Sequence, residues 1–181
     1  MKEINREEID INEFILMERC WELASSSNCK EAQYGAVIVT SNLILGATNL
    51  IIGEGYNHTI EELVCDKCPR RVLNVKSGVA ADLCYSLHAE RCAIDYVKDF
   101  HKDISSLEDS TIYVGKRKNG EIKPTRGKPY CTDCAMDIYV NGIKEVIFYS
   151  QNGGFLVFNS KEFLINSFKN LIDAYEGQLR L

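Results

Sequence analysis

The chain has 181 residues, of which 45% are hydrophobic and 26% charged, and this composition fits one globular domain with a substantial core. Its 21 basic and 26 acidic side chains give a formal net charge of −5, which disfavours a surface that binds polyanions throughout but allows a local basic patch. The N-terminal sequence is unlike a signal peptide and the most apolar stretch, residues 43–52, is too short to span a bilayer, so we expect a soluble, cytoplasmic protein with no membrane partner.

The spacing of apolar residues predicts short helices and strands along the whole chain, with no repeat or low-complexity segment. In chain order we expect a helix over 12–25, strands over 36–40 and 43–52 joined by a turn at 41–42, an irregular segment over 58–87, a helix over 88–100, a strand over 111–114, a helix over 132–141, strands over 145–149 and 155–158, and a final helix over 159–181. Gly53 and Gly55 would end the second strand by permitting unusual backbone angles. Ser160 would cap the final helix.

The order of these elements indicates the class of fold. Strands that alternate with helices predict an α/β domain with helices on both faces of a mostly parallel sheet. The first two strands would be antiparallel, because a tight turn joins them. We therefore expect a single domain over residues 1–181, with its core over 11–150.

The chain holds eight cysteines, fewer than a disulfide-stapled scaffold of this length would carry. Because no secretion signal is expected, a disulfide framework is not expected either, and metal or redox chemistry becomes the leading question. Cys20 and Cys92 fall on apolar helix faces, where we expect them to be core residues.

Two short motifs carry residues suited to metal chemistry, and each opens a predicted helix. His88 is followed two residues later by Glu90, and Cys131 is followed three residues later by Cys134, so the two thiols share one face of a helical first turn. Free backbone N–H groups and the helix dipole stabilise thiolates at this position. One imidazole and two thiolates give three zinc ligands with a fourth position open to water, and Glu90 can take a proton from that water without binding the metal.

Each motif by itself has a simpler interpretation. His88 alone could cap a helix or lie satisfied in the core, and the two thiols could form a redox pair or a closed structural zinc site. The combination of His-Ala-Glu with a proline-led Cys-x-x-Cys favours the catalytic metal site, because a redox pair leaves Glu90 unexplained.

The same motifs resemble the zinc-dependent cytidine and deoxycytidylate deaminase superfamily, and most closely its deoxycytidylate deaminase branch. The resemblance runs from about residue 14 to residue 149. Its further elements are Gly35-Ala-Val-Ile-Val39, Gly55-Tyr-Asn57, Cys68-x-Arg70, Gly78-x5-Cys84-x3-His88 and Gly142-Ile-Lys-Glu-Val146.

The resemblance implies a three-layer α/β/α cytidine deaminase-like fold around a central five-stranded mixed sheet. It implies that the imidazole and the two thiols bind a catalytic Zn²⁺, and that Glu90 transfers protons while water replaces the amino group at C4 of cytosine. It places Asn57 beside the sugar of the substrate and the backbone of Ala89 beside the base. Because relatives are usually oligomers, it also implies a homo-oligomer.

The chain departs from the family pattern in two places. Tyr130 separates the proline from the first cysteine of the pair, and the segment before that proline is longer than in relatives. Residues 115–129 are expected to form an inserted loop with six basic side chains and one acidic one. We expect this loop to bind a substrate phosphate, through Lys116, Arg117, Lys118, Arg126 and Lys128. A solvated surface without a ligand is the alternative.

Three further cysteines, Cys65, Cys68 and Cys84, fall in the segment expected to be irregular, and Cys29 follows the first helix. With Cys29 or His58 as the fourth ligand they would form a second, structural zinc site, as some deoxycytidylate deaminases carry in this region. Such a site would keep the segment ordered. Free buried thiols are an equal alternative.

These features together favour a zinc-dependent hydrolase that deaminates a cytosine nucleotide, with conversion of dCMP to dUMP and ammonia as the favoured reaction. Another amino-heterocycle, such as cytidine, dCTP, guanine or a nucleic-acid base, is the alternative substrate. The alternative outside the enzyme class is a non-catalytic, zinc-stapled nucleotide-binding module, which would not need Glu90. The expected partner is therefore a small nucleotide, and the acidic net charge disfavours a nucleic-acid strand.

Overall fold

The computed structural model describes residues 1–40, 50–60, 63, 67–75, 83–101, 107–125 and 131–179, with side chains described as far as residue 176. The strands are β1 (Lys2–Ile4), β2 (Gln33–Thr40), β3 (Leu50–Tyr56), β4 (Ser110–Lys118), β5 (Glu121–Ile122), β6 (Glu145–Tyr149) and β7 (Phe155–Asn159). The α-helices are α1 (Ile11–Ser25), α2 (Pro69–Val72), α3 (Ala89–Phe100), α4 (Thr132–Val140) and α5 (Ser160–Leu179), and one 3-10 turn covers Arg6–Glu8.

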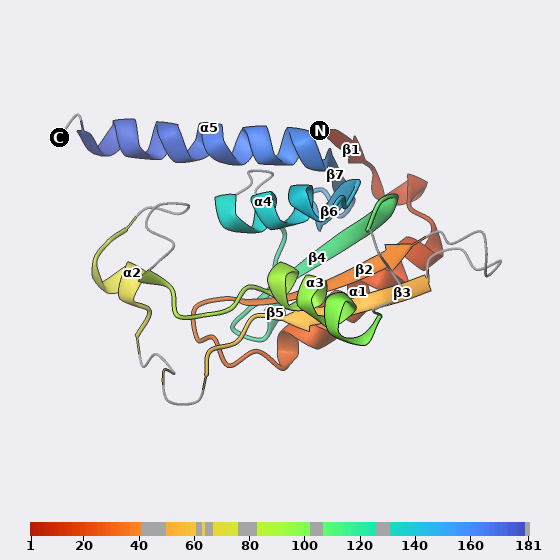
Figure 1. Cartoon of the computed structure of the whole chain (residues 1–181), viewed down its shortest axis with the longest axis horizontal. Coiled ribbons are helices and arrows are strands. Elements are labelled where there is room, and N and C mark those ends of the chain that lie inside the picture. The colour runs from red at the N-terminus through yellow and green to blue at the C-terminus, as the bar shows by residue number, and fades with distance from the viewer. Residues whose placement is uncertain are drawn as a thin grey trace.

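The strands form one sheet in the order β1-β7-β6-β4-β2-β3, with β5 paired to β4 (Figure 1). Among the described strands only β4 and β6 are parallel neighbours, so the expectation of a mostly parallel sheet is wrong. The helical crossovers do make β3, β4 and β6 run in the same direction. However, β2 lies between β3 and β4 and is antiparallel to both, and β7 returns from β6 through a short turn.

The expected mixed sheet of a three-layer α/β/α fold is confirmed, with two short strands beyond the five predicted. One of them, β1, pairs with β7 and extends the sheet at that edge. The other, β5, folds back on the end of β4 through Asn119 and Gly120, whose φ angles of 55° and 79° are those of a tight hairpin turn. The basic segment is therefore a strand and a hairpin over residues 115–122, and not a loop throughout.

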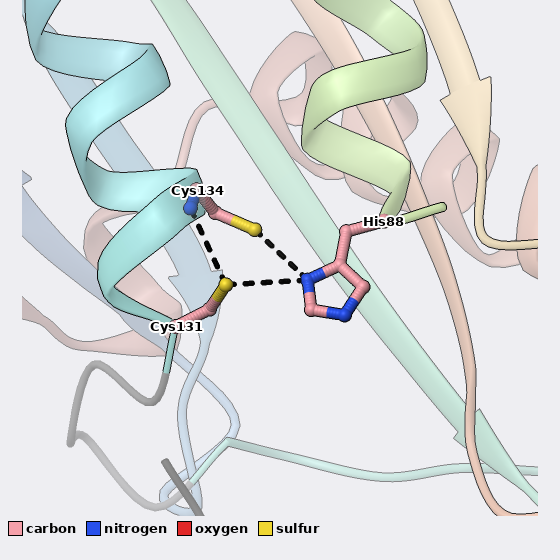
Figure 2. A group of neighbouring side chains, drawn as sticks. All are labelled: His88, Cys131 and Cys134. Atoms are coloured by element: carbon pink, nitrogen blue, oxygen red, sulfur yellow. Dashed lines mark hydrogen bonds between the residues drawn. The ribbon is translucent and has the colours of Figure 1, made fainter. Parts of the chain in front are cut away.

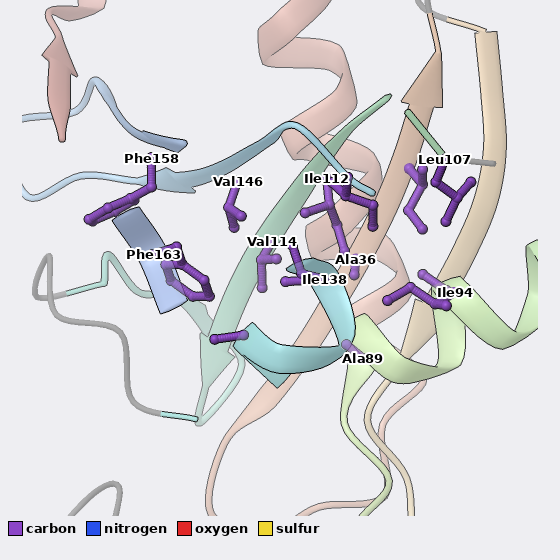
Figure 3. Close-up of a cluster of buried hydrophobic side chains, with 14 of the residues drawn as sticks. Ala36, Ala89, Ile94, Leu107, Ile112, Val114, Ile138, Val146, Phe158 and Phe163 are labelled. Carbon is purple, nitrogen blue, oxygen red and sulfur yellow. The ribbon is translucent and has the colours of Figure 1, made fainter. Parts of the chain in front are cut away.

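The two faces of the sheet carry different helices. On one face α1 packs Met17, Cys20 and Trp21 against Val37 and Tyr113. On the other face α3, α4 and α5 cover a larger cluster that is shown in Figure 3. This second cluster includes Ala36, Ile38, Ala89, Ile94, Ile112, Val114, Ile138, Val146, Phe158 and Phe163. Cys20 is fully buried, as expected of a core residue.

Gly53 and Gly55 allow α3 to lie directly against β3. A Cβ atom on Gly55 would lie 2.4 Å from the backbone nitrogen of Ala93 and 2.6 Å from the carbonyl oxygen of Ala89, and one on Gly53 would lie 2.7 Å from the carbonyl oxygen of Ala93. The strand also continues through Tyr56. The expectation that these glycines end the strand through unusual backbone angles is therefore wrong, because they serve close packing of helix on strand.

Several element boundaries differ slightly from those predicted. Residues 41–49, which include the expected turn and most of the expected second strand, lie outside the described residues. Asn159, and not Ser160, caps α5, because its side-chain oxygen accepts a hydrogen bond from the backbone N–H of Lys161 at 3.1 Å. Gly142, with a φ of 82°, follows the C-cap residue of α4, where glycine commonly ends a helix.

The N-terminal residues are attached to the opposite end of the chain. The ammonium group of Met1 forms an ion pair with Glu162 of α5, next to the pairing of β1 with β7. Among the described helices, none is both long and apolar enough to cross a membrane.

The contact between α3 and β3 can be tested by adding one methyl group. We expect Gly55→Ala to lower the free energy of unfolding by about 1–3 kcal/mol, because the new Cβ forces α3 away from the strand. Gly120→Asn is the matched control, since a Cβ there meets nothing within 4 Å and asparagine accepts a positive φ. Urea denaturation measures both, and equal stability of the two variants would contradict the packing argument.

Candidate metal centre and active site

The site is built at the start of two helices that lie on the same face of the sheet. His88 is the N-cap residue of α3, with extended backbone angles, and Cys131 is the N-cap residue of α4. The sides of the two helices are linked by Arg91, whose guanidinium donates to Asp137 at 2.9 Å. Both predicted motifs therefore stand side by side although more than forty residues separate them.

The three predicted metal ligands converge (Figure 2). The Nδ1 atom of His88 lies 3.0 Å from the sulfur of Cys134 and 3.2 Å from the sulfur of Cys131. All three ligand atoms lie within 4.8 Å of one another, and no other group of three potential ligands among the described residues does so.

The donor set fits zinc. A tetrahedral zinc ion with bonds of about 2.0–2.3 Å holds its ligands roughly 3.6 Å apart, within about half an ångström of the observed spacing. Three protein ligands leave a fourth position for a reacting water, which is the arrangement of catalytic zinc sites. The residues present therefore fit a catalytic zinc ion.

Local contacts favour thiolate at the first cysteine. Its sulfur accepts a hydrogen bond from the backbone N–H of Cys134 at 3.3 Å, at the positive end of α4. The side chains of Cys134 and of His88 also donate to it, and together these contacts lower the pKa of Cys131 to about 4. The same negative charge raises the pKa of His88 to about 11, while the bond to Cys131 and burial raise the pKa of Cys134.

Glu90 stands in the first turn of α3, beside the ligands but outside the group that they form. Burial raises the pKa of its carboxyl group, and its side chain interacts with that of Cys134. Ala89 is fully buried between Glu90 and His88, at the start of the helix. The positions match those expected of a proton-transferring acid next to a metal, although the roles of Glu90 and Ala89 toward a substrate stay predictions.

The expected second zinc site is not assembled among the described residues. Cys29, Cys68, Cys84 and His58 do not bring three ligand atoms within 4.8 Å of one another, and Cys65 lies outside the described residues. Instead, Cys84 hydrogen-bonds to the ring of His88, and this bond lowers the pKa of the Cys84 thiol. The structural zinc therefore stays a prediction.

The two cysteines that were expected in the core differ from each other. Cys92 is half-buried, and its sulfur lies 3.8 Å from Nδ1 of His58. His58 in turn pairs with Leu87 in an isolated antiparallel bridge, so residues 58 and 87 lie side by side just before the start of α3. Cys92 is thus a boundary residue next to the site, and the expectation that it belongs to the core is wrong.

Asn57 lies at the same edge of the sheet and is 5% exposed. Its side-chain oxygen accepts a hydrogen bond from the backbone N–H of Tyr34 at 2.6 Å, and its side-chain nitrogen donates to the carbonyl oxygen of Ala32 at 3.0 Å. These bonds hold the start of β2 against the end of β3. The side chain therefore has a structural role here, and its expected contact with a sugar stays a prediction.

The basic residues of β4 do not act as one cluster, because side chains alternate between the faces of a strand. Ile112 and Val114 face α3 and α4, so Lys116 and Lys118 belong to that face. Arg117 belongs to the face of α1 and donates to the carbonyl oxygen of Gly120 at 2.6 Å. Arg126 and Lys128 lie outside the described residues.

Two residues near this edge were not predicted from the sequence. The ring of Tyr34 lies under the ammonium group of Lys116, 5.7 Å from its centroid. Glu31 accepts a hydrogen bond from Lys118 at 2.8 Å and pairs with Arg71 of α2 at 2.7 Å. Tyr34 and Lys116 stand opposite each other on the paired strands β2 and β4. A correct prediction of this strand register would have indicated the contact between the ring and the ammonium group.

Comparison with known proteins places the chain in one family. The family described as the cytidine and deoxycytidylate deaminase zinc-binding region matches residues 12–150. The matched region contains all three converging ligands and Glu90. A search of curated protein sequences finds no match.

The metal centre can be tested by metal content. We expect the purified chain to bind zinc at this site, and Cys131→Ser and His88→Ala each to lose it, because two ligands rarely hold zinc against competitors. Cys92→Ser is the control, since that thiol is nearby but outside the ligand group. Elemental analysis and the thiolate-to-cobalt absorption of the cobalt-substituted protein give the readout. Zinc and cobalt binding at the wild-type level in Cys131→Ser would refute the assignment.

Proposed function

Because the chain belongs to the cytidine and deoxycytidylate deaminase family, we propose that it is a zinc-dependent hydrolase that removes the amino group from the cytosine of a nucleotide, with dCMP as the favoured substrate. One observation carries the proposal above all. Three metal-ligand atoms converge, from His88, Cys131 and Cys134. Glu90 lies directly beside them, and its carboxyl group is not needed to bind the metal.

The reaction exchanges ammonia for water at one carbon atom. A C–O bond forms from water to C4 of the cytosine, the C–N bond to the amino group breaks, and ammonia leaves as the ring becomes uracil. When bound, zinc supplies Lewis-acid activation of the attacking water near neutral pH. Glu90 takes the proton of that water and delivers it to the departing amine, which is general base and then general acid catalysis by one carboxyl group.

The surroundings suit this proton transfer. Glu90 is half-buried and lies on the first turn of α3, so its carboxyl group is aimed from a rigid element and is partly screened from solvent. Ala89 offers its backbone at the start of the same helix, which is where we propose that the edge of the base binds. The thiols of the site must stay reduced, and this suits the cytoplasm.

The preference for a nucleotide rests on charge. Lys116 and Lys118 lie on the face of the sheet that carries α3 and α4, near the end of β4. Lys118 pairs with Glu31 at 2.8 Å, and the ammonium group of Lys116 lies 5.7 Å from the centroid of the Tyr34 ring. We propose that Lys116 contacts the phosphate of the substrate, because a lysine ammonium can contact an aromatic ring and an anion at the same time.

The mechanism predicts a loss of turnover without a loss of metal. We expect Glu90→Gln to lower ammonia release from dCMP by about 10²–10⁴-fold while zinc content stays unchanged, because only the proton-transferring group is removed. Asp133→Asn is the matched control, since it removes an exposed carboxylate from the first turn of α4.

The assay compares ammonia release from dCMP, cytidine, dCTP, guanine and a cytosine-containing single strand. A zinc-loaded Glu90→Gln enzyme with unchanged turnover would overturn the role of Glu90. A zinc-loaded wild-type chain that is inactive on every substrate of the panel would instead favour a non-catalytic nucleotide-binding module.

The phosphate contact predicts a difference between substrates. We expect Lys116→Met to lower kcat/KM for dCMP by about tenfold and that for cytidine by less than about twofold, because the methionine keeps the packing on Tyr34 and removes only the charge. Arg117→Met is the control from the opposite face. Equal losses for dCMP and cytidine would show that Lys116 does not contact phosphate.

A further inference from the structure

An exposed apolar stripe runs along α5. Ile165, Phe168, Ile172 and Tyr175 are 45%, 40%, 54% and 45% exposed, although all four are large hydrophobic side chains. They follow one another at intervals of three, four and three residues, the spacing that places side chains along one face of a helix in a two-helix seam. Scattered exposed apolar residues are ordinary on a protein surface, but a continuous stripe with this period is not.

The stripe is distinct from the face that α5 uses inside the molecule. The helix packs on the sheet and on α4 through another side, on which Phe163 and Ser167 are buried. Figure 1 shows that the C-terminal half of α5 continues past the end of α4, with no labelled helix or strand beside it. The stripe therefore faces away from the described body of the chain.

The residues that flank the stripe differ between its two sides. Lys169 and Glu176 lie along one side and are both exposed, whereas Leu164 and Leu171 lie along the other. In a parallel pair of helices each charged flank would meet the leucine flank of the other copy. In an antiparallel pair the two charged flanks meet each other, and Lys169 of each helix faces Glu176 of the other.

We propose that α5 pairs with α5 of a second copy of this chain, in antiparallel orientation. Phe168 then packs opposite Ile172 of the other copy, and Ile165 opposite its Tyr175. Because side chains on a helix lean toward its N-terminus, Lys169 and Glu176 approach across this pairing although their Cα atoms are offset along the axis. Two Lys–Glu pairs form by symmetry, and the leucine flanks lie together on the other side.

The contact between the two helices is short, so we expect a dimer that dissociates on dilution. The stripe spans ten residues and hence about 15 Å of helix, roughly three turns. Such a contact is short for an isolated helix pair, but both helices are anchored in folded domains, so little conformational freedom is lost when they associate. The proposal is independent of the reaction, since none of these side chains belongs to the metal centre.

The test is the mass of the full-length, zinc-loaded chain as a function of concentration, measured by sedimentation velocity from micromolar to submillimolar protein. We expect a monomer–dimer equilibrium, and we expect Ile172→Glu to weaken it by more than about tenfold, because the new carboxylate is buried against Phe168 of the other copy. Unchanged thermal unfolding and zinc content establish that the variant is folded. A wild-type chain that stays monomeric throughout, or a dimer that Ile172→Glu leaves intact, overturns the proposal.

Charge reversal tests the orientation. Lys169→Glu and Glu176→Lys should each weaken the dimer by about tenfold, because each turns two attractive pairs into two repulsive ones, and the double variant should restore it. Asp173→Lys is the matched control, with the same change in charge at an exposed position outside the flank. Failure of the double variant to restore association, or an equal effect of Asp173→Lys, rules out the antiparallel arrangement.

Discussion

The backbone of α3 lies directly on β3 at two glycines, and the position of the metal centre depends on this contact. A side chain at Gly53 or Gly55 would push α3 away from β3. It would thereby also move His88, the N-cap residue of α3, relative to Cys131. Ordinary helix-on-sheet packing leaves a layer of side chains between the two, which lets the helix shift. At Gly53 and Gly55 no strand side chain stands between the two backbones, so the start of α3 is held at one distance from β3.

The sheet brings the second half of the site to the same place. The strands β3, β4 and β6 run in one direction. The helices α3 and α4, which come after β3 and β4 in the chain, therefore both begin at the same end of the sheet, although β2 lies between the two strands. Each helix presents an N-cap residue there, with free N–H groups and the positive end of its dipole behind it. Two helix starts that face one position stabilise thiolate ligands there, and these thiolates attract a divalent cation.

Charge around the site is more balanced than its sequence indicates. A run of basic residues leads into the second motif, but the strand separates Arg117 from Lys116 and Lys118, and the carboxylate of Glu31 pairs with both Lys118 and Arg71. The pairing at Glu31 also connects α2, the end of β4 and the segment before β2. A carboxylate at this position lowers the local positive potential.

The amino-acid sequence predicted four of the helices, α1, α3, α4 and α5, and the three residues that converge as candidate metal ligands, but it did not predict the short helix α2. It also predicted the strands β2, β4, β6 and β7, with shorter bounds for β2 and β4, whereas most of the predicted second strand lies outside the described residues. Periodicity and residue chemistry are local properties, and His-x-Glu and Cys-x-x-Cys fix their own geometry within one helical turn. The sequence did not determine strand direction, because the alternation of strands and helices is the same whether β2 lies beside or between the parallel strands. The sequence also did not determine the packing role of the glycines of β3, the hydrogen-bond partners of Asn57, or the division of the basic residues between the two faces of the sheet. Those depend on which backbone lies against which, and only the tertiary structure brings such distant segments into contact.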